Sequence, residues 1–402
     1  METKIITETV TDAAAIIRAG GLVAVPTETV YGLAGNGLDE RAVAEIYEVK
    51  GRPAVKPLSL MVPDESAMER YCLDVPPQAH ALARRFWPGP LTIVLKAREE
   101  IPAIVRAGGK TVGLRCPDHA LTLALLRECC LPLAAPSANP SGAESPKTAQ
   151  QVLDYFDGKI DAVIDGGPCG IGRESTLIDM SAAPYRILRE GALSKAEIAQ
   201  ALAENLTVIG ITGPSGVGKT TSLRELETLG ALVLDCDAVY HEMLQNDDAL
   251  LSALGEAFPG TVRSGTLDRK SLGKIVFSDP EKLALLNRIS HTYIGLEIEK
   301  RLRDFAMKGG TLAAIDAVEL ISAGLDKRCT AVLGILSDRK TRLDRIVARD
   351  GITQEEAEAR IMAQKPDSYY ETHCTHILFN NADSDRFAAD CRALFKEIIN
   401  HG

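Results

Sequence analysis

The sequence has few aromatic residues and none of the long apolar runs that membrane-spanning helices need. Aromatic side chains make up 4% of the 402 residues, and tryptophan occurs once. The N-terminal stretch mixes charged and apolar residues, and no apolar run approaches the roughly 20 residues of a membrane helix. We therefore expect neither a secretory signal nor a membrane span, and we expect a cytoplasmic protein.

The chain also lacks paired cysteines and an excess of positive charge. Its nine cysteines are scattered without a C-x-x-C spacing, which argues against a disulfide framework and favours a reducing compartment. The formal net charge of -10 makes a broad basic surface for nucleic acid unexpected, so we do not expect direct tRNA binding. Small anionic ligands remain possible, because a few basic side chains suffice to bind them.

What the chain does contain is a regular alternation of short apolar runs and helical patterns, which is typical of the α/β class. A chain of this length is expected to form two domains. An amphipathic helix pattern over 194–205, with Ser194 as N-cap, is followed at once by an apolar strand pattern at 207–211. We therefore predict domains at 1–205 and 206–402, with almost no linker.

The clearest motif is a phosphate-binding loop in the second half. Residues 213–220 match G-x-x-x-x-G-K-[ST] at every fixed position, after an apolar strand and before a helix. The pattern predicts backbone N–H groups around phosphate oxygens, Lys219 at the β- and γ-phosphates, and the Thr220 hydroxyl on Mg²⁺. The predicted ATP-binding residues are Gly213, Ser215, Gly216, Val217, Gly218, Lys219, Thr220 and Thr221.

Two further features suit phosphoryl transfer. Asp235 and Asp237 lie at the end of the next predicted strand, where a carboxylate can accept the proton of an attacking hydroxyl. Arg345 and Arg349 are four apart on one helix face, as suits a lid over the transferring phosphoryl group. The alternatives are a pair of solvated acids and a surface helix held by salt bridges.

These motifs together resemble dephospho-CoA kinases over nearly the whole second half. The resemblance also rests on L-D-R-K at 267–270, Leu286-Asn287 with His291, R-D-G-I-T at 349–353, Ala363-Gln364 and Asn380. It implies a P-loop kinase with a parallel sheet and a helical lid and substrate region. It also implies transfer of phosphate from ATP to the 3′-hydroxyl of dephospho-CoA, with Asp237 as catalytic base and with Lys219, Arg345 and Arg349 assisting.

The chain departs from this family pattern at three places. A P-L-L-F-E run is replaced by V-E-L-I-S at 318–322, Thr292 stands for a proline, and Thr375 stands for an acidic residue. Two alternatives therefore stay open for the second half. It is a nucleotide-sensing regulator without catalysis, or a kinase of another small-molecule hydroxyl.

The first half has no such loop, so a nucleotide there must be held by side chains. Lys50, Arg52 and Lys56 form a local basic cluster suited to a triphosphate, and Arg115 suits a carboxylate or phosphate. Neutral hydrogen bonds for a small polar ligand are available from Thr29, Ser137, Ser175 and Asn139. No nucleophile or acid–base pair is required, so positioning is the expected source of catalysis.

Taken in order, the motifs of the first half resemble the YrdC-like threonylcarbamoyl-AMP synthases over residues 5–195. The most specific are P-T-E-T-V-Y-G-L at 26–33, K-G-R-P at 50–53 and S-A-N-P-S-G at 137–142. The resemblance implies a twisted mixed sheet with a basic concavity. It implies that L-threonine, bicarbonate and ATP give threonylcarbamoyl-AMP, which is handed to a tRNA-modifying transferase complex.

The same resemblance assigns residues to the two substrates. Thr29, Arg115, Ser137 and Ser175 would bind threonine, while Lys50, Arg52, Lys56, Thr111, Asn139 and Arg189 would bind ATP. Met61 stands where many members of the family carry histidine. The interpretation of the whole chain is a bifunctional enzyme that uses ATP and Mg²⁺, and an RNA-binding module of the same fold is the alternative for the first half.

Overall fold

The computed structural model describes residues 2–381 and 383–401 and divides into two compact units. The N-terminal unit comprises the residues up to Asn205 together with Met307–Gly309, and the C-terminal unit comprises Leu206–Ala306 and the residues from Gly310 onward. Within the described ranges, no helix is both long enough and apolar enough to cross a membrane.

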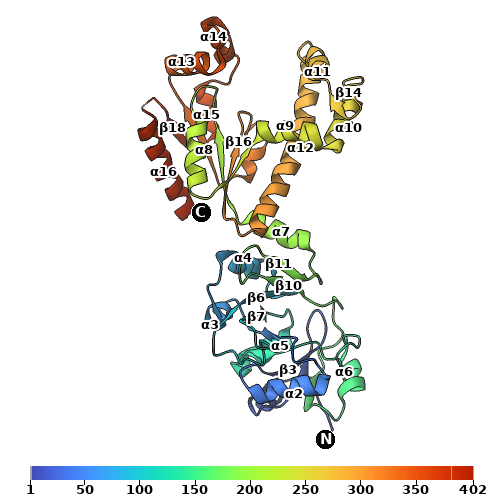
Figure 1. Ribbon diagram of the computed structural model, residues 1–402. Helices are drawn as coiled ribbons and strands as arrows, with labels where there is room; N and C mark the ends of the chain where they lie inside the picture. The colour runs from blue at the N-terminus through green and yellow to red at the C-terminus, as the bar shows by residue number, and fades with distance from the viewer. Residues whose placement is uncertain (1, 382, 402) are drawn as a thin grey trace. The chain divides into compact units, whose positions relative to one another are not determined.

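A twisted mixed sheet forms the N-terminal unit, with strands in the order β1-β9-β2-β3-β8-β4-β7-β6-β10-β11 and β5 beside β6 (Figure 1). Strand β6 pairs parallel with β10 and antiparallel with β7, so both senses occur around one strand. The strands are β1 (Lys4–Ile6), β2 (Val23–Val25), β3 (Gly32–Asn36), β4 (Ser59–Met61), β5 (Cys72–Leu73), β6 (Leu91–Ala97), β7 (Thr111–Arg115), β8 (Leu133–Ala134), β9 (Ala162–Ile164), β10 (Thr176–Asp179) and β11 (Arg186–Arg189).

Amphipathic helices bury their apolar faces against this sheet. In one cluster, Ile17 of α1 and Leu125 of α5 pack on Val25, Leu133 and Ile164 of the strands. The helices are α1 (Thr11–Arg18), α2 (Glu40–Lys50), α3 (Ala67–Tyr71), α4 (Pro77–Phe86), α5 (Ala120–Cys129), α6 (Ala149–Phe156) and α7 (Lys195–Glu204). Helix α7 starts as predicted, because Ser194 and Glu197 form a reciprocal capping box.

The C-terminal unit is built on a five-stranded parallel sheet in the order β13-β16-β12-β17-β18, which confirms the predicted α/β class. Its strands are β12 (Thr207–Thr212), β13 (Leu232–Asp235), β16 (Leu312–Asp316), β17 (Ala331–Leu336) and β18 (His376–Phe379), and a separate hairpin pairs β14 (Val262–Arg263) with β15 (Thr266–Leu267). Helices α8 (Lys219–Thr228) and α16 (Ser384–His401) contact each other, and Leu226, Phe387 and Phe395 share a core with the strands.

Two helical groups extend beyond this sheet. One group comprises α9 (Cys236–Asn246), α10 (Asp248–Ala257), α11 (Arg269–Val276) and the long α12 (Pro280–Met307). The other comprises α13 (Arg339–Asp350) and α14 (Gln354–Met362), followed by α15 (Asp367–His373), while a short 3-10 helix η1 covers Leu325–Arg328. Figure 1 shows α13 and α14 above the sheet and α10 and α11 to its right. Helices α13 and α14 have a small core of their own, made of Leu343, Ile346 and Ala357.

Candidate active sites

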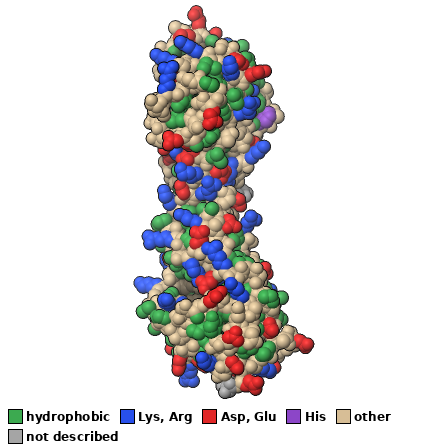
Figure 2. Space-filling view, turned by 90° about the vertical axis from the view of Figure 1, so that its right-hand side faces the viewer, with side chains coloured by type: hydrophobic (Ala, Val, Ile, Leu, Met, Phe, Trp, Pro, Cys, Tyr) green, Lys and Arg blue, Asp and Glu red, His purple; other side chains and the backbone are tan. Residues whose placement is uncertain are grey.

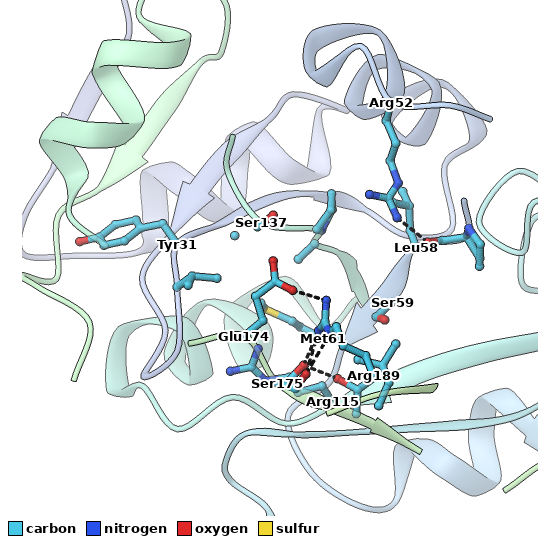
Figure 3. A pocket seen from close by; sticks show the side chains of 17 residues that line it. Tyr31, Arg52, Leu58, Ser59, Met61, Arg115, Ser137, Glu174, Ser175 and Arg189 are labelled. Carbon is cyan, nitrogen blue, oxygen red and sulfur yellow. Dashed lines mark hydrogen bonds and ion pairs between the residues drawn. The ribbon is translucent and has the colours of Figure 1, made fainter. Parts of the chain in front are cut away.

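A cavity of about 170 Å³ opens among the strand ends of the N-terminal unit. Basic and hydroxyl side chains face it from opposite sides: Arg52 enters from the loop after α2, while Arg115, Ser175 and Arg189 gather across from it (Figure 3). The lining consists of Val30, Tyr31, Gly32, Arg52, Pro57, Leu58, Ser59, Met61, Thr92, Arg115, Ala135, Pro136, Ser137, Glu174, Ser175, Leu177 and Arg189.

Arg115 is held in place by a buried network. Its guanidinium group forms an ion pair with Glu28 at 2.8 Å, donates to the Thr29 hydroxyl at 2.7 Å and lies 3.4 Å from the Gly89 carbonyl oxygen. Both charged side chains are about nine-tenths buried, so the pair is weakly screened. Thr29 is itself buried, and it supports Arg115 without lining the cavity.

A second ion pair crosses the cavity rim. Arg189 pairs with Glu174, and its guanidinium also donates to the Ser175 carbonyl oxygen at 2.8 Å and to the Ser175 hydroxyl at 3.2 Å. Ser175 in turn shares a hydrogen bond of 2.9 Å with Thr92. The sequence interpretation named Ser175 but gave the Glu174 carboxylate no role. The position of Glu174 directly before Ser175 was the available signal.

Lys50 has a different position from the one expected of an ATP ligand. Its ammonium group is buried and donates to the main-chain carbonyl oxygens of Ser137 and Asn139. Burial, and to a smaller extent the nearby charge of Arg52, lowers the pKa of Lys50 to about 7. Lys50 therefore fixes the loop that carries Ser137 and is absent from the cavity lining.

The cavity brings together some of the predicted ligands and leaves others outside. Arg52, Arg115, Ser137, Ser175 and Arg189 line it, and Met61, the register partner of Arg115 on β4, lies beside them. Asn139 is buried next to the lining, and its Oδ1 atom has no hydrogen-bond partner. Lys56 is exposed, and Thr111 lies at the opposite end of β7 from Arg115, so neither residue lines the cavity.

The phosphate loop of the C-terminal unit lies between the central strand β12 and helix α8, as predicted. Gly213, Gly216 and Gly218 all have positive φ angles, of 144°, 84° and 91°. A Cβ atom at Gly213 would lie 2.3 Å from the Ile335 carbonyl oxygen. This backbone path is therefore open only to glycine. Of the loop amides, that of Ser215 already donates to Gln364 Oε1 at 3.1 Å.

Lys219 forms an ion pair with Asp316 at the end of β16. The Lys219 Nζ atom lies 2.8 Å from Asp316 Oδ1, and both side chains are largely buried. Burial raises the pKa of Asp316, while the Lys219 charge opposes that rise. The charge of the loop lysine is thus balanced by the Asp316 carboxylate.

The predicted Mg²⁺ ligand Thr220 is exposed at the start of α8. Among the residues that the structure describes, no group of three or more His, Cys, Asp or Glu side chains is arranged to hold a metal ion. A single hydroxyl beside a phosphate loop fits Mg²⁺ that arrives with its nucleotide, since Mg²⁺ takes phosphate oxygens and waters as its other ligands.

Of the two predicted lid arginines on helix α13, Arg345 contacts the phosphate loop and Arg349 contacts another residue. Arg345 donates to the Gly216 and Val217 carbonyl oxygens at 3.3 and 3.4 Å, and Asn380 donates to Val217 at 2.7 Å. Arg349 points elsewhere and forms a two-point ion pair with the neighbouring Asp350.

Arg342 was missed by the sequence interpretation. It is buried, approaches the Ser215 carbonyl oxygen at 3.3 Å and donates to Gln364 at 2.9 Å. Gln364 also donates to the Ser215 hydroxyl at 2.7 Å. The only signal was that Arg342 precedes Arg345 by three residues, close to one helical turn.

A second cavity, of about 240 Å³, contains Asp237, and its lining includes Ala317, the residue after the Lys219 partner Asp316. Asp235 and Asp237 do not act as a pair on a strand, because Asp235 caps α9 and accepts from the main-chain N–H groups of Asp237 and Ala238. The Asp237 carboxylate lies in the first turn of α9. The lining is Cys236, Asp237, Tyr240, Leu286, Asn287, Ser290, His291, Ile294, Ala317, Val318, Glu319, Ala323 and Leu325.

Comparison with known proteins divides the chain at the same place. Residues 15–191 match the Sua5/YciO/YrdC family, described as telomere recombination, and residues 207–386 match the dephospho-CoA kinase family. A threonylcarbamoyl-AMP synthase of Pyrococcus abyssi is 48% identical over 192 residues, which cover 48% of this chain and 56% of that protein. The chain thus spans about half the length of the first curated relatives that it matches.

Two shorter relatives are covered almost completely. A putative threonylcarbamoyl-AMP synthase of Mycobacterium tuberculosis is 35% identical over 48% of this chain and 88% of its own length. A dephospho-CoA kinase of Symbiobacterium thermophilum is 34% identical over 48% of this chain and 81% of its own length. The chain therefore belongs to the Sua5/YciO/YrdC family through its first half and to the dephospho-CoA kinase family through its second half.

Proposed function

We propose that the chain is a bifunctional enzyme with two independent ATP-dependent activities. The N-terminal unit forms threonylcarbamoyl-AMP from L-threonine, bicarbonate and ATP, and the C-terminal unit phosphorylates the 3′-hydroxyl of dephospho-CoA. Family membership supports the two reaction classes. The substrates of each site are inferred from the chemistry of its cavity and from the resemblance.

For the synthase, the main support is the convergence of Arg52, Arg115 and Arg189 with hydroxyl groups on one small cavity. Arg115 would bind the threonine carboxylate, and Ser137 and Ser175 would orient the rest of the amino acid. Arg52 and Arg189 suit the phosphates of ATP. The carbamate oxygen of N-carboxythreonine then attacks the α-phosphorus and pyrophosphate leaves, so the unit catalyses by orientation and charge stabilisation.

Threonine-dependent release of pyrophosphate from ATP in the presence of bicarbonate tests this proposal. Arg115→Ala should reduce this release about 100-fold or more, because the substrate carboxylate loses its cationic partner. The exposed Arg84 on α4 provides the control, and Arg84→Ala should leave the rate unchanged. Absence of threonine-dependent release from the unmodified protein would contradict the proposal.

For the kinase, the main support is the Asp237 carboxylate in a cavity whose lining includes Ala317, next to the Lys219 partner Asp316. Asp237 would accept the proton of the acceptor hydroxyl as that oxygen attacks the γ-phosphorus of ATP. Lys219 would leave Asp316 and bind the phosphates. Mg²⁺, held in part by Thr220, would neutralise charge on the β- and γ-phosphate oxygens.

Formation of CoA from ATP and dephospho-CoA tests the kinase activity. Asp237→Asn should lower turnover about 100-fold or more, since general base catalysis contributes about that much. Asp304→Asn, at an exposed position of α12, is the matched control and should have no effect. ATP binding without turnover in the unmodified protein would instead favour a nucleotide-sensing regulator.

The proposed location and partners follow from the synthase activity. All nine cysteines are free, which supports a reducing cytoplasm. The product would pass to a tRNA-modifying transferase complex. Direct RNA binding is the second candidate function, but Lys and Arg are interspersed with Asp and Glu over the face in Figure 2, which argues against it there.

A further inference from the structure

The charged side chains that line the cavity around Asp237 disfavour phosphate. Its lining includes the carboxylates of Asp237 and Glu319, the imidazole of His291, the phenol of Tyr240 and the amide of Asn287. None of the lining residues that the structure describes is lysine or arginine. Two carboxylates without a neighbouring cation in the lining repel an anion, and they favour hydrogen-bond donors.

Glu319 is fixed at the mouth of this cavity by the turn that follows β16. The Ala323 N–H donates to the Glu319 carbonyl oxygen at 2.8 Å, which closes one helical turn. The Ser322 hydroxyl, three residues after Glu319 and on the same face of that turn, donates to the Glu319 carboxylate. The Glu319 charge also reaches across the cavity, where it raises the pKa of His291 against the larger lowering caused by burial.

We infer that Glu319 is a specificity-determining residue of the acceptor site, which accepts a hydrogen bond from an amine or hydroxyl group on the uncharged nucleoside end of the acceptor. This inference rests on the proposed kinase function and names the part of the acceptor that enters the cavity. The phosphates of the acceptor stay outside, where the two carboxylates do not repel them. The apolar side chains of Leu286, Ile294 and Val318 offer a surface for a flat base.

The position of the Glu319 carboxylate explains how the altered sequence at 318–322 can still bind an acceptor. The P-L-L-F-E pattern has its glutamate at the place of Ser322, while this chain has a glutamate three residues earlier and a serine bonded to it. Residues three apart in a helical turn present side chains to the same side. The exchange therefore moves the carboxylate by one turn without removing it.

Steady-state kinetics of three variants test the inference. Glu319→Leu should raise the KM for dephospho-CoA about tenfold, the size expected for a lost hydrogen bond to a charged group, with kcat within about twofold. The double variant Glu319→Leu/Ser322→Glu should recover a KM within about threefold of the original, because the carboxylate returns to the same face. The KM for ATP should change in neither variant.

Glu256→Leu is the matched control, because Glu256 is also exposed and accepts a hydrogen bond from a serine, Ser252, but lies outside the cavity. It should leave every constant unchanged. An unchanged KM for dephospho-CoA in Glu319→Leu, or a double variant no better than the single one, overturns the inference.

Calorimetry with adenosine separates this inference from the kinase proposal. With the ATP site filled by a non-hydrolysable ATP analogue, the unmodified protein should bind adenosine, and Glu319→Leu should bind it about tenfold more weakly. If adenosine binds in this way while dephospho-CoA is not phosphorylated, the kinase proposal fails and the inference stands. Adenosine binding that is equal in both proteins, or absent from both, overturns the inference.

Discussion

In the proposed functions, the two units would bind phosphate-bearing ligands by different physical means. The C-terminal unit would use the backbone, because three glycines shape the phosphate loop. The N-terminal unit would use arginine side chains, each paired with a carboxylate: Arg115 with Glu28 and Arg189 with Glu174. A backbone site depends on the space around its glycines, whereas a side-chain site depends on its charge pairs.

The largest effect should come from closing the space around the loop. A Cβ atom at Gly218 would lie 2.3 Å from Asn380 Nδ2, at a φ of +91° that other residues rarely adopt. Gly218→Ala should therefore reduce CoA formation about 100-fold or more and leave pyrophosphate release unchanged. Gly295→Ala on α12 is the control, because a Cβ atom there meets nothing within 4 Å. Full kinase activity in Gly218→Ala would show that the phosphate site does not depend on the space around this glycine.

The next largest effect concerns the charge pair of the N-terminal unit. Arg115→Met leaves Glu28 buried without its partner, and the unfolding free energy should fall by about 3 kcal/mol. In Arg115→Met/Glu28→Met, much of that stability should return while pyrophosphate release stays lost. Chemical denaturation and the release assay together measure the two quantities. Equal unfolding free energies of the single and double variants would show that Arg115 and Glu28 do not form a buried ion pair.

The lid arginines should differ from each other. Arg345 contacts the loop carbonyl oxygens, whereas Arg349 is occupied by Asp350. Arg345→Ala should lower kcat for CoA formation about 30-fold and Arg349→Ala about threefold, within the range of charge-assisted contacts. Equal losses in both variants would mean that Arg349 leaves Asp350 when substrates bind.

A smaller effect should follow from the buried Lys50. Its pKa is lowered to about 7 in the folded protein, so between about pH 7 and about pH 10 the unfolded chain binds a proton there that the folded chain does not. The unfolding free energy should therefore rise with pH over that window, relative to Lys50→Met. Denaturation of both proteins at pH 7 and pH 9.5 gives this difference, and parallel curves would contradict the lowered pKa.

The smallest effect is expected at Lys56, which is exposed and outside the lining. Lys56→Ala should change the KM for ATP in pyrophosphate release by no more than about threefold, as is usual for a screened surface charge. A loss comparable to that of Arg115→Ala would show that the loop around Lys56 folds over the cavity when ATP is present.

The sequence predicts regular elements well and local side-chain partners poorly. The helix pattern over 194–205 and the strand pattern at 207–211 correspond to α7 and β12, whereas β3 has no strand pattern, because its Gly-Leu-Ala-Gly-Asn sequence lacks the β-branched residues typical of strands. Small residues are needed there, since a Cβ atom at Gly35 would lie 2.9 Å from Leu22.

Among the site residues, the loop glycines were predictable because their spacing is local. Lys50 and Arg349 looked like ligands because they are basic and lie within the right motifs. Lys50 donates to the Ser137 carbonyl oxygen 87 positions away, a contact that depends on tertiary packing and that sequence spacing does not identify. Arg349 pairs with its chain neighbour Asp350, and the sequence does not show whether it contacts that carboxylate or the loop.

The ion pair of Lys219 with Asp316 bears on which anions can occupy the loop. A phosphate group that binds at Lys219 must displace a carboxylate that lies 2.8 Å from the lysine, or share the lysine with it. We therefore expect Asp316 to oppose an anion whose only strong contact is Lys219 more than it opposes a triphosphate that also contacts the loop amides.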